Sequence, residues 1–107
     1  MPTTSNIFLN IPSTMANETF EAIVTAGDLK IERIISKGHV SPKDFWYDQP
    51  NSEWVMVLKG KAKLRFSEKD EVIELNPGDH LDIPPHVKHR VEWTDPDQET
   101  IWLAVHY

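Results

Sequence analysis

Cysteine is absent from this chain of 107 residues. Disulfide frameworks, thiolate metal sites and cysteine nucleophiles are therefore excluded. Apolar runs are short, and no window approaches the roughly 20 apolar residues needed to cross a bilayer. Residues 1–17 contain no basic start followed by an apolar run, so we expect neither secretion nor membrane insertion. Together these absences predict a cytoplasmic protein.

Positive charge is scarce. The chain has 11 Lys and Arg against 17 Asp and Glu, a formal net charge of -6. Such a molecule would repel phosphate backbones, so we do not expect a nucleic-acid partner. Hydrophobic residues make up 39 % of the sequence, which at this length is enough for one core but not for two domains.

A sustained apolar stripe at helical spacing is also missing. Glycines and prolines fall almost entirely between apolar segments, and the segments themselves alternate with a period of two, most clearly over Lys61–Phe66. This pattern predicts an all-β domain, a sandwich or barrel, over residues 18–107. We expect strands near residues 19–25, 29–36, 45–48, 53–58, 61–66, 71–75, 80–83, 89–94 and 100–107.

Two of these strands, 53–58 and 101–105, are apolar on both faces. Val55 and Val57 share a side with Glu53, while Trp54, Met56 and Leu58 point the opposite way. The outer side needs cover, either from an N-terminal segment at residues 1–17 or from a second copy of the chain. We predict a homodimer, and we expect Trp54 and Trp102 either to fill an interface or to pack in the core, as large aromatic residues of small β-proteins more often do.

Gly78, Pro84 and His89 stand in the spacing of a known motif. The arrangement resembles the second motif of the cupin superfamily, which is a glycine, five residues, a proline, one residue, a glycine, two residues and a histidine. His86 stands where the second glycine is usual. Upstream, Glu53 is followed by six residues and then Gly60, which matches the end of the first cupin motif.

This resemblance implies a single-domain cupin-type jelly-roll β-barrel with a site in its mouth, to which Glu53 and His89 would contribute. The family also has two histidines, separated by one residue, three or four residues before the glutamate. Neither is present here. The four-residue gap places Trp46 and Asp48 at these positions, and the three-residue gap places Tyr47 and Gln49 there, so both registers remain open.

The register decides what the site could bind. If Asp48 points inward, then Asp48, Glu53 and His89 form a carboxylate-rich set that a divalent ion such as Zn, Fe, Mn or Ni would accept. If Tyr47 and Gln49 point inward, they add only neutral donors to the set of metal ligands, and the site could bind a substrate directly without an ion. The candidate metal ligands are therefore Asp48, Gln49, Glu53 and His89.

The other candidate residues would shape a ligand pocket. Val91 and Trp93 have the parity of His89 and predict an apolar wall, suited to a small organic ligand. We take Trp46, Tyr47 and Trp93 as candidate ligand-binding residues. The remaining histidines give no functional signal: His39, His80 and His86 are expected at the surface, and His106 lies near the terminus.

Three functional hypotheses follow. The first is a protein that binds a divalent metal and a small organic ligand, with the oxygenase, isomerase or lyase chemistry that occurs in the resembled family. The second is a metal-free module that binds or senses a small ligand, with Glu53 and His89 as hydrogen-bonding partners. The third is an accessory subunit that docks another protein through its apolar outer strand.

Overall fold

The computed structural model describes residues 2–107 and confirms the all-β prediction. Met1, the first residue of the expected N-terminal segment, lies outside the described residues. Within residues 2–107, no helix could span a membrane. The strands are β1 (Thr19–Ala26), β2 (Leu29–Ser36), β3 (Glu53–Lys59), β4 (Ala62–Phe66), β5 (Glu71–Leu75), β6 (His80–Ile83), β7 (His89–Thr94) and β8 (Thr100–His106).

One predicted strand is wrong. Residues 45–48 form no ladder, and Tyr47 makes only an isolated antiparallel bridge with His89. The chain enters this segment from a turn, in which the N–H of Phe45 donates to the carbonyl oxygen of Pro42 at 3.1 Å and Asp44 has a φ of 64°. It therefore crosses the end of β7 as a loop.

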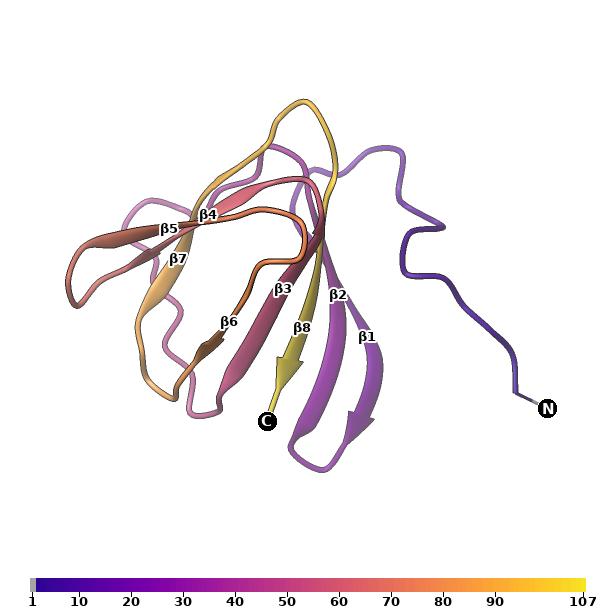
Figure 1. Cartoon of the computed structure of the whole chain (residues 1–107), viewed down its shortest axis with the longest axis horizontal. Coiled ribbons are helices and arrows are strands. Elements are labelled where there is room, and N and C mark those ends of the chain that lie inside the picture. The colour runs from indigo at the N-terminus through magenta and orange to yellow at the C-terminus, as the bar shows by residue number, and fades with distance from the viewer. Residues whose placement is uncertain (1) are drawn as a thin grey trace.

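Two antiparallel sheets make up the molecule (Figure 1). One has five strands in the order β1-β2-β8-β3-β6, and the other has three in the order β5-β4-β7. The hydrophobic core lies between them, with buried side chains from both sheets such as Val57, Leu64 and Trp102. Of the two alternatives for Trp102, an interface or the core, the structure shows the core, with the residue 3 % exposed.

The register of the large sheet sets which residues face inward. Glu53 pairs with His106 on β8 and with Ile83 on β6, and Val57 pairs with Trp102. Because side chains alternate along a strand and register partners share a face, Glu53 and His106 point to the same interior. The predicted inward side of β3 is confirmed, since Glu53, Val55 and Val57 are all buried.

A β-bulge in β7 changes the face of one candidate residue. Leu64 on β4 pairs with Val91, but the next pair is Lys63 with Trp93, so Glu92 is an extra residue. A bulge of this kind reverses the alternation beyond it. Trp93 therefore lies on the outer face, where the Lys63 amino group is 5.4 Å from its ring centroid, and does not reach the interior.

The N-terminal segment contacts the outer side of β2. Arg33 is buried and donates hydrogen bonds to the carbonyl oxygens of Ile7 (3.0 Å), Leu9 (2.6 Å) and Asn10 (3.3 Å). The same guanidinium pairs with Glu21 of β1 at 2.6 Å. The segment thus lies beside the β1–β2 edge of the molecule rather than over β3 (Figure 1).

Gly60 is required because the turn after β3 lies against the start of β8. Its φ is +88°, and a Cβ at this position would lie 2.4 Å from Oγ1 and 2.7 Å from Cα of Thr100. Any other residue would clash with backbone atoms and be strained in φ. His86, which stands where the second glycine of the second motif is usual, also has a positive φ of 62°.

Candidate functional site

A cavity of about 250 Å³ lies between the two sheets and is the candidate site. Its lining combines an apolar wall with an unusual number of ionisable groups. The lining residues are Glu18, Phe20, Lys30, Glu32, Ile34, Tyr47, Gln49, Glu53, Val55, Leu64, Ile83, His89, Val91, Trp102 and His106.

Glu53 and His89, the two residues of the motif resemblance, meet in this cavity. Nε2 of His89 lies 3.4 Å from Oε1 of Glu53, and both residues are buried, at 5 % and 8 % exposure. Nδ1 of His89 lies 2.9 Å from the carbonyl oxygen of Val87, which can only accept, so Nδ1 carries a proton. The imidazole is therefore fixed with Nε2 turned toward the carboxylate.

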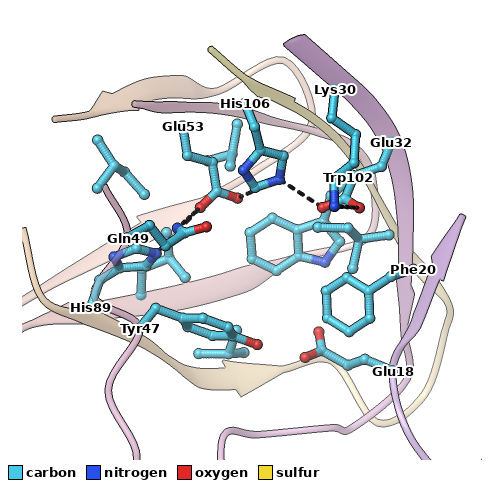
Figure 2. A pocket seen from close by; sticks show the side chains of 15 residues that line it. Glu18, Phe20, Lys30, Glu32, Tyr47, Gln49, Glu53, His89, Trp102 and His106 are labelled. Carbon is cyan, nitrogen blue, oxygen red and sulfur yellow. Dashed lines mark hydrogen bonds and ion pairs between the residues drawn. The ribbon is translucent and has the colours of Figure 1, made fainter. Parts of the chain in front are cut away.

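The backbone bridge between Tyr47 and His89 shows which of the two alternative registers is present. The backbone N–H of Tyr47 donates to the carbonyl oxygen of His89 at 2.7 Å, and the N–H of His89 donates back at 3.1 Å. The two rings stack with centroids 5.4 Å apart. As a result Tyr47 and Gln49 line the cavity, and Nε2 of Gln49 donates to Oε1 of Glu53 at 2.8 Å (Figure 2).

The alternate residues of this segment do not line the cavity. Asp48 is exposed, and its Oδ1 lies 2.8 Å from Nδ1 of the exposed His86. Trp46 lies against Arg90, whose guanidinium carbon is 6.0 Å from the indole centroid. Of the seven candidate site residues, the structure brings Tyr47, Gln49, Glu53 and His89 together and leaves Trp46, Asp48 and Trp93 outside.

His106 and Glu32 are cavity residues for which the sequence gave no functional signal. Nε2 of His106 lies 2.7 Å from Oε1 of Glu32 and 4.0 Å from Oε2 of Glu53. Lys30 reaches Oε2 of Glu32 at 3.4 Å. Parity could have indicated His106, because it shares a face with Trp102 four residues earlier. Its strand is apolar on both faces, however, and does not reveal which face is the inner one.

The cavity contains opposite charges held at fixed positions. Burial alone would raise the pKa of Glu53, but hydrogen bonds from His89 and Gln49 and the charge of His106 outweigh it, so the pKa lies below the usual value. The hydrogen bond with Glu32 raises the pKa of His106. At neutral pH Glu53 is therefore a carboxylate that accepts hydrogen bonds.

Glu18 is the least compensated acid of the lining. Burial raises its pKa, and the hydrogen bond that its carboxylate accepts from the Ser36 hydroxyl only partly opposes this. The cavity acids also act on Tyr47. Burial first, and then the charges of Glu18, Glu53 and Glu32, raise the pKa of Tyr47 to about 12. This shift indicates a negative potential around its hydroxyl.

The donor set does not fit a divalent metal. Glu53 and His89 are the only strong donors of the predicted set in the cavity, since Asp48 lies outside and Gln49 points its N–H₂ group, not its oxygen, at Glu53. Within residues 2–107, no cluster of three or more His, Asp, Glu or Cys side chains is arranged to hold a metal ion. Zn, Fe, Mn and Ni sites in proteins need three or more such donors.

Known structures share this architecture. A proposed mannose-6-phosphate isomerase of Ralstonia eutropha JMP134 is 45 % identical, with a TM-score of 0.94 over 98 % of this chain and 97 % of that one. A cupin superfamily protein of Desulfitobacterium hafniense DCB-2 is 18 % identical, with a TM-score of 0.73 over 90 % of this chain and 82 % of that one. Iron(II) HppE is 15 % identical, with a TM-score of 0.73 over 92 % of this chain and 54 % of that one.

The last two likenesses concern the fold alone. A comparison with curated protein sequences gives no match. The model of the cupin domain matches residues 31–106, which include β3, β7, β8 and both ends of the Glu53–His89 contact. The two sheets are the jelly roll that the resemblance implied, and the chain belongs to the cupin family.

Proposed function

We propose that this cupin binds a small polar organic molecule in the cavity and contacts it directly with side chains, without a metal ion. The observation that carries the proposal is the state of Glu53. Its Oε1 accepts the hydrogen bond of Gln49, while Oε2 has no side-chain hydrogen bond within residues 2–107 and lies 4.0 Å from Nε2 of His106. Oε2 is not fully buried, because it is not among the buried polar atoms that lack a partner, so a donor on a ligand in the cavity would bond to it.

Apolar side chains complete a pocket suited to such a ligand. Tyr47 and Trp102 supply flat surfaces, and Ile34, Val55 and Leu64 exclude water. A few polar groups within an apolar lining fix the orientation of a bound molecule. The volume of about 250 Å³ lies below the range of roughly 300–1,000 Å³ that is typical for drug-sized ligands, so the ligand is small.

A phosphate group is poorly matched to this lining. Within residues 2–107 the cavity has one lysine and no arginine, and that lysine already pairs with Glu32. Three glutamates face the same space. Phosphate recognition usually relies on arginine, lysine or helix N-termini. The name of the Ralstonia relative therefore suggests a hydroxylated carbon skeleton more than a phosphate ester for this chain.

The metal-dependent hypothesis has less support. It rests on the iron in one structural neighbour and on the fixed His89 imidazole, but of its two alternative third ligands Asp48 lies outside the cavity and Gln49 turns its N–H₂ group toward Glu53. Direct binding needs no third ligand. Glu53 and His89 then act as the hydrogen-bonding partners that the second hypothesis assigned to them.

A binding screen tests the proposal. The full chain is treated with a chelator and screened by saturation-transfer NMR against small polyols, aldoses, amines and carboxylic acids, with mannose and mannose 6-phosphate as a matched pair. Hits are titrated calorimetrically into wild type, Glu53→Gln and the control Glu68→Gln, which alters an exposed carboxylate in the β4–β5 turn.

We expect at least one neutral or cationic hit whose affinity falls about tenfold or more in Glu53→Gln and is unchanged in Glu68→Gln, because a tenfold change corresponds to one lost hydrogen bond of ~1.4 kcal/mol. Mannose 6-phosphate should bind no more tightly than mannose. A screen without hits, or hits that bind Glu53→Gln as well as wild type, would contradict the proposal.

A further inference from the structure

The lysine of the cavity pairs with Glu32 and not with the other two glutamates that line it. Glu32 is held by both His106 at 2.7 Å and Lys30 at 3.4 Å. Glu18 and Glu53 have no lysine or arginine partner within residues 2–107; Glu18 accepts from the Ser36 hydroxyl, and Glu53 accepts from the Gln49 amide with His89 at 3.4 Å. Glu53 thus has the imidazoles of His89 and His106 beside it, Glu18 has the Ser36 hydroxyl, and neither carboxylate is paired with a lysine or arginine of the described residues.

Aromatic faces line the space between these two carboxylates. Figure 2 shows Glu53 and Glu18 on different sides of the cavity, with the ring of Trp102 between them in the view and Phe20 and Tyr47 nearby. Aromatic faces are negative, so they attract a positive charge placed over them. Phe20 is 51 % exposed although it lines the cavity, which leaves its ring available to a ligand entering from solvent.

We infer that the ligand of this cavity is a small organic cation, an amine or a quaternary ammonium compound, held between Glu18, Glu53 and the aromatic side chains. The inference rests on the proposed function and names the ligand class for that site. The cation supplies the positively charged partner that Glu18 lacks within the described residues, and its apolar substituents pack on Trp102 and Phe20. Carboxylates combined with aromatic faces are a general means of recognising alkylammonium groups.

The inference assigns a role to two residues outside the motif resemblance. Glu18 directly precedes β1 and Phe20 lies near its start, so neither comes from the strands that carry Glu53 and His89. Their contribution depends on charge for Glu18 and on the aromatic face for Phe20. Each can be removed without altering the Glu53–His89 contact.

A matched pair of probes separates charge from shape. Choline and its uncharged carbon analogue 3,3-dimethylbutan-1-ol have nearly the same size and the same hydroxyl group. Both are titrated into the chelator-treated full chain, with binding followed by isothermal calorimetry and by amide chemical shifts. Tetramethylammonium serves as a third probe that lacks the hydroxyl. The variants are Glu18→Gln, Phe20→Leu and the control Glu68→Gln.

We expect choline to bind about tenfold or more tightly than its carbon analogue. Glu18→Gln and Phe20→Leu should each weaken choline binding about fivefold or more and leave the analogue unchanged, while Glu68→Gln alters neither. Equal binding of the two probes overturns the inference, and so does the absence of any binding by the cations. In either case the proposed function survives if a neutral compound binds in a manner that depends on Glu53, so the two failures are distinguishable.

Discussion

Glu53 of β3 and His106 of β8 are register partners, and their side chains face the same cavity with Oε2 and Nε2 4.0 Å apart. This separation is too long for a hydrogen bond, so the two groups attract each other electrostatically but make no direct hydrogen bond. The gap is kept because His106 is already bonded to Glu32 and Glu53 to Gln49. The polar side of the cavity is thus built before any ligand arrives.

Replacing His106 should lower stability in a pH-dependent manner. The raised pKa of His106 means that its contribution to stability is fully present below the ordinary pKa of 6.5 and is lost as the pH rises through the higher folded pKa. The pKa of Glu32 is lowered: burial would raise it, but the hydrogen bond and charge of His106 outweigh this. The Glu32 contribution is therefore present above the ordinary pKa of 4.5.

His106→Gln should therefore cost about 1–3 kcal/mol near pH 5.5, within both windows, and clearly less near pH 9. Urea unfolding at the two pH values measures the difference. A cost that grows with pH would contradict the assigned pairing.

Glu18→Gln should stabilise the free protein. Burial raises the pKa of Glu18, so its ionised form is unfavourable in the folded state, and stability falls as the pH rises above the ordinary pKa of 4.5. A neutral amide keeps an acceptor for the Ser36 hydroxyl and removes this penalty. We expect a gain of about 0.5–2 kcal/mol near pH 7, in the usual range for stabilising substitutions, and little change near pH 4. Thermal melts at both pH values test this, and a loss of stability at pH 7 would argue against a buried, uncompensated carboxylate.

Replacing Trp102 should cost much more stability than replacing Trp93, because the β7 bulge places Trp93 on the outer face. Trp102 is 3 % exposed and its Nε1 donates to Oγ of Ser36 at 3.1 Å, so Trp102→Ala should cost about 3–5 kcal/mol. Trp93 lies outside beside Lys63, so Trp93→Ala should cost about 1 kcal/mol and leave ligand binding intact. Chemical unfolding of both variants compares them. Similar costs, or lost binding in Trp93→Ala, would place Trp93 inside.

We predict a homodimer formed through the outer face of β3. Met56 pairs with Leu103 on this face, and the N-terminal segment lies at the β1–β2 edge instead of covering it. Light scattering after size exclusion should give twice the chain mass for wild type and the chain mass for Met56→Glu. Val72→Glu, on the exposed part of β5, is the matched control and should stay dimeric. A wild type that is monomeric across the concentration range rules the dimer out.

The positions of the strands along the chain could be predicted well from the sequence, because the alternation of apolar residues and the glycines and prolines between strands are local signals. The strand ends at Ala62–Phe66 and His80–Ile83 differ little from the expected ones. Two predictions, the strand at 45–48 and the inward side chain of Trp93, were wrong for physical reasons that the sequence pattern does not reveal. The segment at 45–48 lacks ladder partners, and the extra residue Glu92 reversed the face of Trp93.

The site was predictable only in part. Glu53 and His89 could be named because their spacing resembles that of a family, whereas the choice between Asp48 and Gln49 depended on backbone hydrogen bonds between Tyr47 and His89. Glu32 and His106 contact each other across 74 residues of sequence, on strands where polar and apolar faces do not alternate cleanly. Only the fold places them in the same cavity.

The most direct test of the account is a calorimetric titration of the tightest-binding ligand into wild type before and after chelator treatment, and into chelator-treated Glu53→Gln. The account predicts the same dissociation constant for wild type in both states and one that is about tenfold or more higher for the variant. Loss of binding on chelation that is restored by added metal, or unchanged binding in Glu53→Gln, would contradict it.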